Sequence, residues 1–90
     1  MAPIALTLYT RPGCHLCADM EHILRPVATE LGCALEQVDI STDPALEARF
    51  GLESPVLLVN GRKAFKYRLT ERELRRRLQA ERRPSTPSTD

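Results

Sequence analysis

The chain has 90 residues, of which 42% are hydrophobic and 28% charged, a composition typical of one small globular domain. No apolar run approaches the roughly 20 residues that a membrane-spanning helix needs, so we expect no membrane segment. The net charge of only +1 excludes a chain that is strongly basic or acidic as a whole.

The N-terminal region predicts a strand followed by a helix, with two cysteines at the junction. Residues 4–10 form an apolar run, and Arg11-Pro12-Gly13 breaks it. Apolar residues then recur at three- and four-residue intervals, which predicts a helix over about residues 14–31. Cys14 and Cys17 therefore lie in the first turn of this helix. Unpaired N–H groups and the helix dipole at that end favour a thiolate over a thiol at Cys14.

The middle of the chain predicts a second strand and a short second helix. Residues 35–40 form a strand that is less regular than the first. Asp43 is a suitable N-cap, and Pro44 suits the first helical position. We therefore expect a short helix that begins here and ends near Gly51.

A hairpin of two strands follows. Residues 56–59 are an unbroken apolar run, and Asn60-Gly61 is a strong signal for a tight turn, so residues 62–67 form the returning strand. We expect short right-handed connections to make the first three strands parallel and the hairpin to make the fourth antiparallel. The result is an α/β fold with a four-stranded mixed sheet and helices on both of its faces.

The C-terminal region predicts a last helix and a tail. Thr70 and Glu73 form a capping box, which predicts a helix over residues 71–83. Residues 84–90 have no apolar side chain to bury, so we expect them to be disordered. This leaves one domain over residues 1–83.

The arginine-rich last helix raises the question of nucleic acid. Residues 1–60 hold three Lys or Arg and eight Asp or Glu, whereas residues 61–90 hold ten and four. Glu71 and Glu73 each precede an arginine by four residues, which is the spacing of ion pairs on an exposed helix. No aromatic residue lies among the arginines to stack on bases. We therefore do not expect nucleic acid as a partner.

With these elements in order, the chain resembles the thioredoxin-fold superfamily, specifically the small glutaredoxin-like proteins with a Thr-Arg-Pro-Gly-Cys-x-Leu-Cys signature. The resemblance covers about residues 4–80. It rests on three segments, which are residues 10–17, Val38-Asp39-Ile40 with Asp43-Pro44, and Ser54-Pro55-Val56. It implies a thioredoxin-like fold in which a cis peptide bond precedes Pro55 and this proline faces the cysteine pair.

The resemblance also implies a thiol-disulfide oxidoreductase that needs no cofactor and holds no metal. Cys14 would attack a protein or small-molecule disulfide, and Cys17 would resolve the mixed disulfide that forms. Arg11 and His15 can add positive potential beside Cys14, and we assign both to substrate binding. The backbone of Ser54-Pro55 would dock the substrate.

The thiol reductant is left open by the sequence. Glutaredoxins that use glutathione commonly have Thr-Val before the cis proline and a Gly-Gly pair after the fourth strand. The matching places here hold Glu53-Ser54 and residues 66–69, which contain no glycine. We therefore do not expect glutathione to be the reductant.

Two other functions compete with this one. The first is a metal or iron-sulfur module in which Cys14 binds a cluster shared between two chains, although a zinc site normally needs four ligands. The second is a non-catalytic interaction domain that uses the last helix as its contact surface. The odd number of cysteines, three, and a start without a secretory signal favour a reducing compartment, so we expect a cytoplasmic protein.

Overall fold

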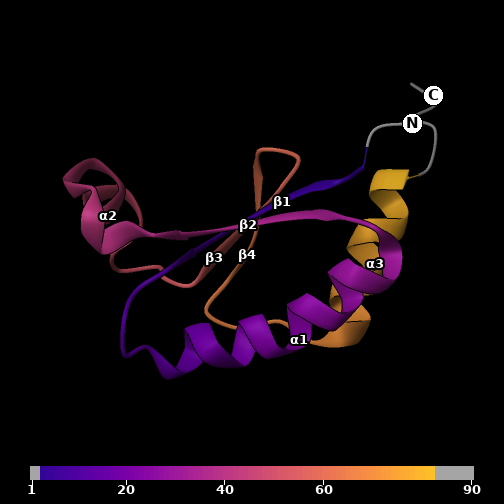
Figure 1. Cartoon of the computed structure of the whole chain (residues 1–90), viewed down its shortest axis with the longest axis horizontal. Helices are drawn as coiled ribbons and strands as arrows, with labels where there is room; N and C mark the ends of the chain where they lie inside the picture. Colours follow the sequence, from indigo (N-terminus) through magenta and orange to yellow (C-terminus); the bar gives the residue numbers. More distant parts are fainter. Residues whose placement is uncertain (1–2, 83–90) are drawn as a thin grey trace.

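The computed structural model describes residues 3–82, which form a four-stranded sheet flanked by helices (Figure 1). The elements in chain order are β1 (Ala5–Thr10), α1 (His15–Leu31), β2 (Ala34–Asp39), the 3₁₀ helix η1 (Ile40–Thr42), α2 (Pro44–Phe50), β3 (Val56–Val59), β4 (Arg62–Lys66) and α3 (Glu71–Arg82). The predicted order of strands and helices is confirmed. The predicted end of the last helix and the disordered tail over 84–90 lie outside the described residues.

The direction of β3 differs from the prediction. The strand order is β2-β1-β3-β4; β1 and β2 are parallel, but β3 is antiparallel to β1, so the expectation of three parallel strands is wrong. The seven residues of α2 span only about 10 Å, half the length of a six-residue strand, so the helix by itself does not carry the chain back to the start of β1. Instead α2 lies beyond the end of the sheet where β1 finishes, and the chain re-enters the sheet there (Figure 1).

The helix starts follow the predicted local signals. The Asp43 carboxylate accepts the backbone N–H of Ala45 at 2.9 Å, which makes it the N-cap of α2. At α3 the backbone N–H of Glu73 donates to Thr70 Oγ1 at 3.1 Å, and the Glu73 carboxylate accepts the Thr70 N–H at 3.2 Å. The predicted capping box is therefore confirmed. In the described part of the chain, no helix combines the length and apolar character needed to cross a bilayer.

The hairpin turn forms as predicted, but the returning strand is shorter. Asn60 and Gly61 both have positive φ, at 51° and 82°, as a tight two-residue turn requires. β4 ends at Lys66, one residue before the predicted end, because Tyr67 has a φ of 68° and leaves the extended conformation.

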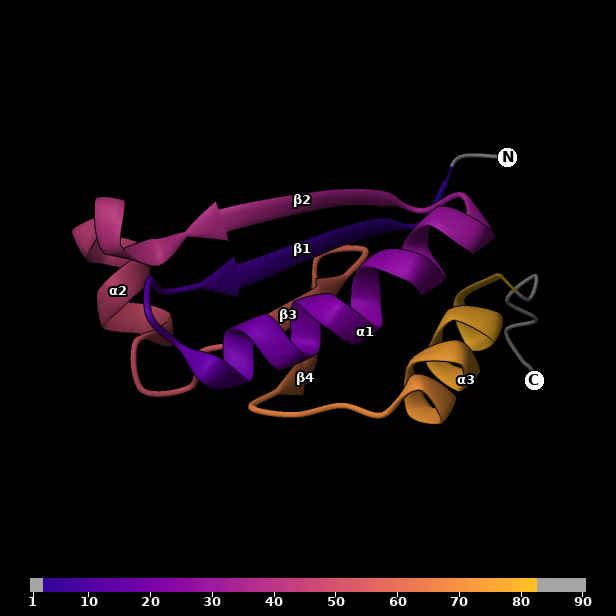
Figure 2. The ribbon, with the colours of Figure 1, turned by 60° about the horizontal axis from the view of Figure 1, so that its bottom comes forward.

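Helices pack against both faces of the sheet, as predicted, but α2 contacts only one end of its face. One face packs against α1 and α3, with Leu6, Leu8 and Leu57 buried beneath them (Figure 2). The opposite face packs against α2 at one end, where the ring of Phe50 stacks on Tyr9 at 4.6 Å between centroids. The two clusters follow from the alternation of side chains along β1 and β3.

Because Phe50 is only 1% exposed and anchors α2 to the sheet, we expect Phe50→Ala to lower the free energy of unfolding by about 3–5 kcal/mol. Leu52→Ala is the matched control. Leu52 lies two residues later and is 95% exposed, so its truncation should change the stability by less than about 0.5 kcal/mol. Urea unfolding of both variants measures the difference, and equal midpoints would contradict this role of Phe50.

Candidate active site

The two cysteines lie in the first turn of α1, as predicted, and differ in exposure. Cys14 is the N-cap, and its Sγ accepts the backbone N–H of Cys17 at 3.2 Å. Cys14 is partly exposed, whereas Cys17 is only 4% exposed. Both are free thiols in this structure. A residue three positions along a helix lies on the same face, so the two side chains can meet.

The surroundings of Cys17 act on its ionisation in opposite directions. Burial raises the pKa of the Cys17 thiol above its ordinary value, and the neighbouring Cys14 side chain adds to this effect. The Ser54 hydroxyl and a backbone hydrogen bond from Arg11 lower this pKa, but the net shift remains upward. Cys17 is therefore a thiol in a dry environment with two specific polar partners.

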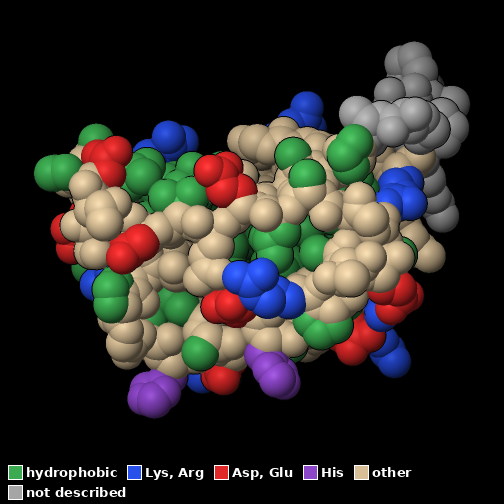
Figure 3. Space-filling model, in the orientation of Figure 1, with side chains coloured by type: hydrophobic (Ala, Val, Ile, Leu, Met, Phe, Trp, Pro, Cys, Tyr) green, Lys and Arg blue, Asp and Glu red, His purple; other side chains and the backbone are tan. Residues whose placement is uncertain are grey.

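The structure brings Arg11 and His15 together with Cys14. All three line a shallow groove of about 480 Å³, and both Arg11 and His15 are exposed. The other lining residues come from the end of β1, the turn, α1 and β2, and are Thr10, Gly13, Ala18, Glu21 and Gln37. The two histidines of the chain, His15 and His22, stand out along the lower edge in Figure 3, where α1 lies in Figure 1.

Ser54 and Pro55 reach this site from the segment between α2 and β3. The Ser54–Pro55 peptide bond is cis, as the resemblance implied, and both residues are buried. The Ser54 Oγ lies 3.5 Å from the Sγ of Cys17. The contact therefore involves the serine side chain, whereas the sequence had suggested a role for the backbone alone.

Tyr67 holds this segment in place and was not predicted. Its backbone N–H donates to Pro55 O at 2.9 Å, and its phenol donates to Leu52 O at 3.2 Å. A positive φ favours glycine, so nothing in the sequence signals this conformation at a tyrosine. The two hydrogen bonds attach to residues on either side of Glu53 and Ser54.

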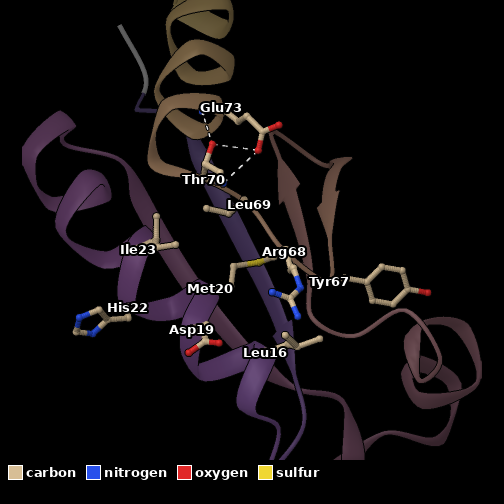
Figure 4. A pocket seen from close by; sticks show the side chains of 10 residues that line it. All are labelled: Leu16, Asp19, Met20, His22, Ile23, Tyr67, Arg68, Leu69, Thr70 and Glu73. Carbon is tan, nitrogen blue, oxygen red and sulfur yellow. Dashed lines mark hydrogen bonds between the residues drawn. The ribbon is translucent and has the colours of Figure 1, made fainter.

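A second groove, of about 500 Å³, lies between α1 and the segment that leads into α3. Leu16, Met20 and Ile23 of α1 face Leu69 across it, while the Tyr67 ring points away towards the segment after α2 (Figure 4). This groove begins next to the cysteine pair, because Leu16 lies between the two cysteines in sequence. Most of the surface that its lining residues expose is apolar.

Within residues 3–82, no cluster of three or more His, Cys, Asp or Glu side chains is arranged to hold a metal ion. The reactive groups that the site brings together are the thiols of Cys14 and Cys17. One accessible sulfur and one buried sulfur lie one helical turn apart and can close a disulfide.

The chain is similar to known proteins over most of its length. The family model described as Glutaredoxin-like domain (DUF836) matches residues 5–79. An uncharacterized protein from Mycobacterium tuberculosis is 33% identical over 73 residues, which cover 76% of this chain and 75% of that protein.

Solved structures show the same fold. The X-ray structure of target protein XcR50 from X. campestris is 37% identical, covers 83% of this chain and 96% of its own, and has a TM-score of 0.69. A mutant thioredoxin from Halobacterium salinarum is 20% identical, with a TM-score of 0.64 and coverage of 86% of this chain and 73% of its own, and it shows the fold alone. The chain therefore has a thioredoxin fold and belongs to the glutaredoxin-like domain family.

Proposed function

We propose that the protein is a thiol-disulfide oxidoreductase that uses Cys14 and Cys17 as its redox pair. The observation that carries the proposal is the position of Cys14, partly exposed at the N-cap of α1, one turn before a buried Cys17. An exposed sulfur can reach a substrate, and a sheltered sulfur on the same helix face can then attack it. A helix N-terminus favours the negative charge that the first step needs.

The reaction proceeds in two exchanges. The Cys14 thiolate attacks one sulfur of a substrate disulfide, forms a mixed disulfide and releases the other substrate sulfur as a thiolate. Cys17 then loses its proton and attacks the Cys14 sulfur, which closes the Cys14–Cys17 disulfide and releases the second substrate thiolate. The two thiolates leave with the two protons that the cysteines gave up. Two electrons pass from the protein to the substrate, and an external thiol reductant restores the dithiol.

The substrates we propose are protein or small-molecule disulfides. Arg11 and His15 border the groove at Cys14 and would attract an anionic part of the substrate. The backbone at Ser54–Pro55 would hold an extended substrate segment. We place the protein in the cytoplasm, where a reducing environment keeps thiols such as its three cysteines free.

The two cysteines should have different roles in exchange. Cys14→Ser should abolish reduction of a disulfide substrate, because the nucleophile is lost, whereas Cys17→Ser should accumulate a mixed disulfide at Cys14. Mass spectrometry of the non-reduced protein after mixing with substrate measures the adduct. Cys33→Ser is the matched control, since Cys33 follows the far end of α1, and it should retain full turnover.

The opposite pattern would contradict the roles assigned to Cys14 and Cys17. If Cys14→Ser formed the stable adduct and Cys17→Ser turned over normally, the buried sulfur would be the nucleophile. If none of the three variants lost activity, the reduction would not depend on the Cys14–Cys17 pair.

The resolving step should be faster at alkaline pH. Burial raises the pKa of the Cys17 thiol, so near neutral pH only a small fraction is the reactive thiolate. Below that raised pKa, the rate of mixed-disulfide resolution should increase about tenfold for each pH unit. Single-turnover experiments that follow release of the second substrate thiol measure this rate. A rate that is flat between pH 6 and 8, which is roughly the physiological range, would contradict a thiol of raised pKa as the attacking group.

Glutathione should be a poor reductant. Tyr67 occupies the backbone position after β4 with its phenol bonded to Leu52 O, and the Glu53 carboxylate beside Ser54 is paired with Lys63 at 2.5 Å. Residues 66–69, which follow or end β4, contain no glycine that would let glutathione approach the backbone closely. Turnover coupled to glutathione and its reductase should be much slower than with thioredoxin reductase or a dithiol. If the glutathione-coupled turnover of this protein equalled that of a glutathione-using glutaredoxin assayed alongside, the expectation would be wrong.

A further inference from the structure

The Ser54 side chain is an unusual feature of this site because it is polar and buried. Within residues 3–82, only Thr10 and Ser54 combine a polar side chain with burial, at 7% and 8% exposure. A buried hydroxyl needs a hydrogen-bond partner, since burial without one is costly. The partner of Ser54 Oγ is the Cys17 Sγ at 3.5 Å, within reach for an atom as large as sulfur.

A hydroxyl at this distance can serve the sulfur in both of its protonation states. It accepts a hydrogen bond while Cys17 carries its proton, and it donates one when the proton has left, since either atom can be the donor. Water cannot do this easily, because Cys17 is only 4% exposed. The hydroxyl opposes the effect of burial and draws the Cys17 pKa down, as does the Arg11 backbone.

The structure also holds the hydroxyl in place. Ser54 lies between Leu52 and Pro55, whose carbonyl oxygens accept the phenol and the backbone N–H of Tyr67. Both anchors are independent of the cysteines. The hydroxyl therefore stays in position when Cys17 changes its charge or its bonding, and little reorganisation is needed at that moment.

We propose that Ser54 is a catalytic residue whose hydroxyl donates a hydrogen bond to the Cys17 thiolate during the resolving exchange. This inference rests on the proposed function, because it concerns its second step. In that step the Cys17 thiolate attacks Cys14 Sγ, the Cys14–Cys17 bond forms and the substrate thiolate leaves. The hydroxyl keeps its own proton throughout, and the proton that Cys17 releases is taken up by the buffer or, where the departing thiolate is basic enough, by that thiolate.

An aromatic disulfide reagent that releases a coloured thiolate separates the two steps. In a Cys33→Ser background, the first equivalent of colour reports attack by Cys14 and depends on reagent concentration. The second equivalent reports resolution by Cys17 and does not depend on reagent concentration. Ser54→Ala should leave the first phase unchanged and slow the second by about 3- to 15-fold, because less Cys17 is then thiolate, while the higher nucleophilicity of the more basic thiolate offsets about half of that loss.

Three further variants complete the test. Ser54→Thr keeps a hydroxyl and should restore much of the second rate, whereas Ser54→Gly lacks it and should be slow like Ser54→Ala, which guards against a packing defect in one variant. Ser41→Ala removes a serine hydroxyl that bonds to Asp39 and should change neither phase. A normal second phase in Ser54→Ala or Ser54→Gly overturns the role of Ser54 alone. A wild-type protein without a second phase overturns the proposed function and this inference with it.

Discussion

The antiparallel pairing of β3 with β1 is the constraint on which the whole site depends. Because the two strands run in opposite directions, the start of β3 lies beside the end of β1, with Val56 opposite Tyr9. The residues just before β3 are therefore brought next to the residues just after β1. Those are Ser54 and Pro55 on one side and the turn into α1 on the other. Neither segment alone contains the site, and the sheet register fixes their separation.

This arrangement gives the two sulfurs different surroundings from elements far apart in sequence. The position of Cys14 depends on local structure, since its Sγ accepts a hydrogen bond from the first turn of the helix that follows it. Cys17 is buried, and its polar partners are supplied by the segment before β3 and by the backbone of Arg11 in the turn. The site therefore holds one accessible sulfur and one sheltered sulfur within a single turn of helix. Loosening the strand register would alter Cys17 more than Cys14.

Much of the fold could be predicted because its signals are local. The capping box at Thr70, the N-cap at Asp43 and the Asn60-Gly61 turn each depend on a few neighbouring residues, and all form as expected. The direction of β3 could not be read in this way, because it depends on where the chain re-enters the sheet after α2. The conformation of Tyr67 and the contact of the Ser54 hydroxyl also depend on tertiary packing, which leaves no pattern in the sequence.

The side chain of Asn60 joins three parts of the molecule that are distant in sequence. Its carbonyl oxygen accepts the backbone N–H of Ala5 at the start of β1, and its amide donates to Glu81 near the end of α3, both at 2.9 Å. The first strand and the last helix are thus fastened to the same hairpin turn. Fraying at either end of the described chain would therefore remove a hydrogen-bond partner from the same turn, which couples local opening of the two ends.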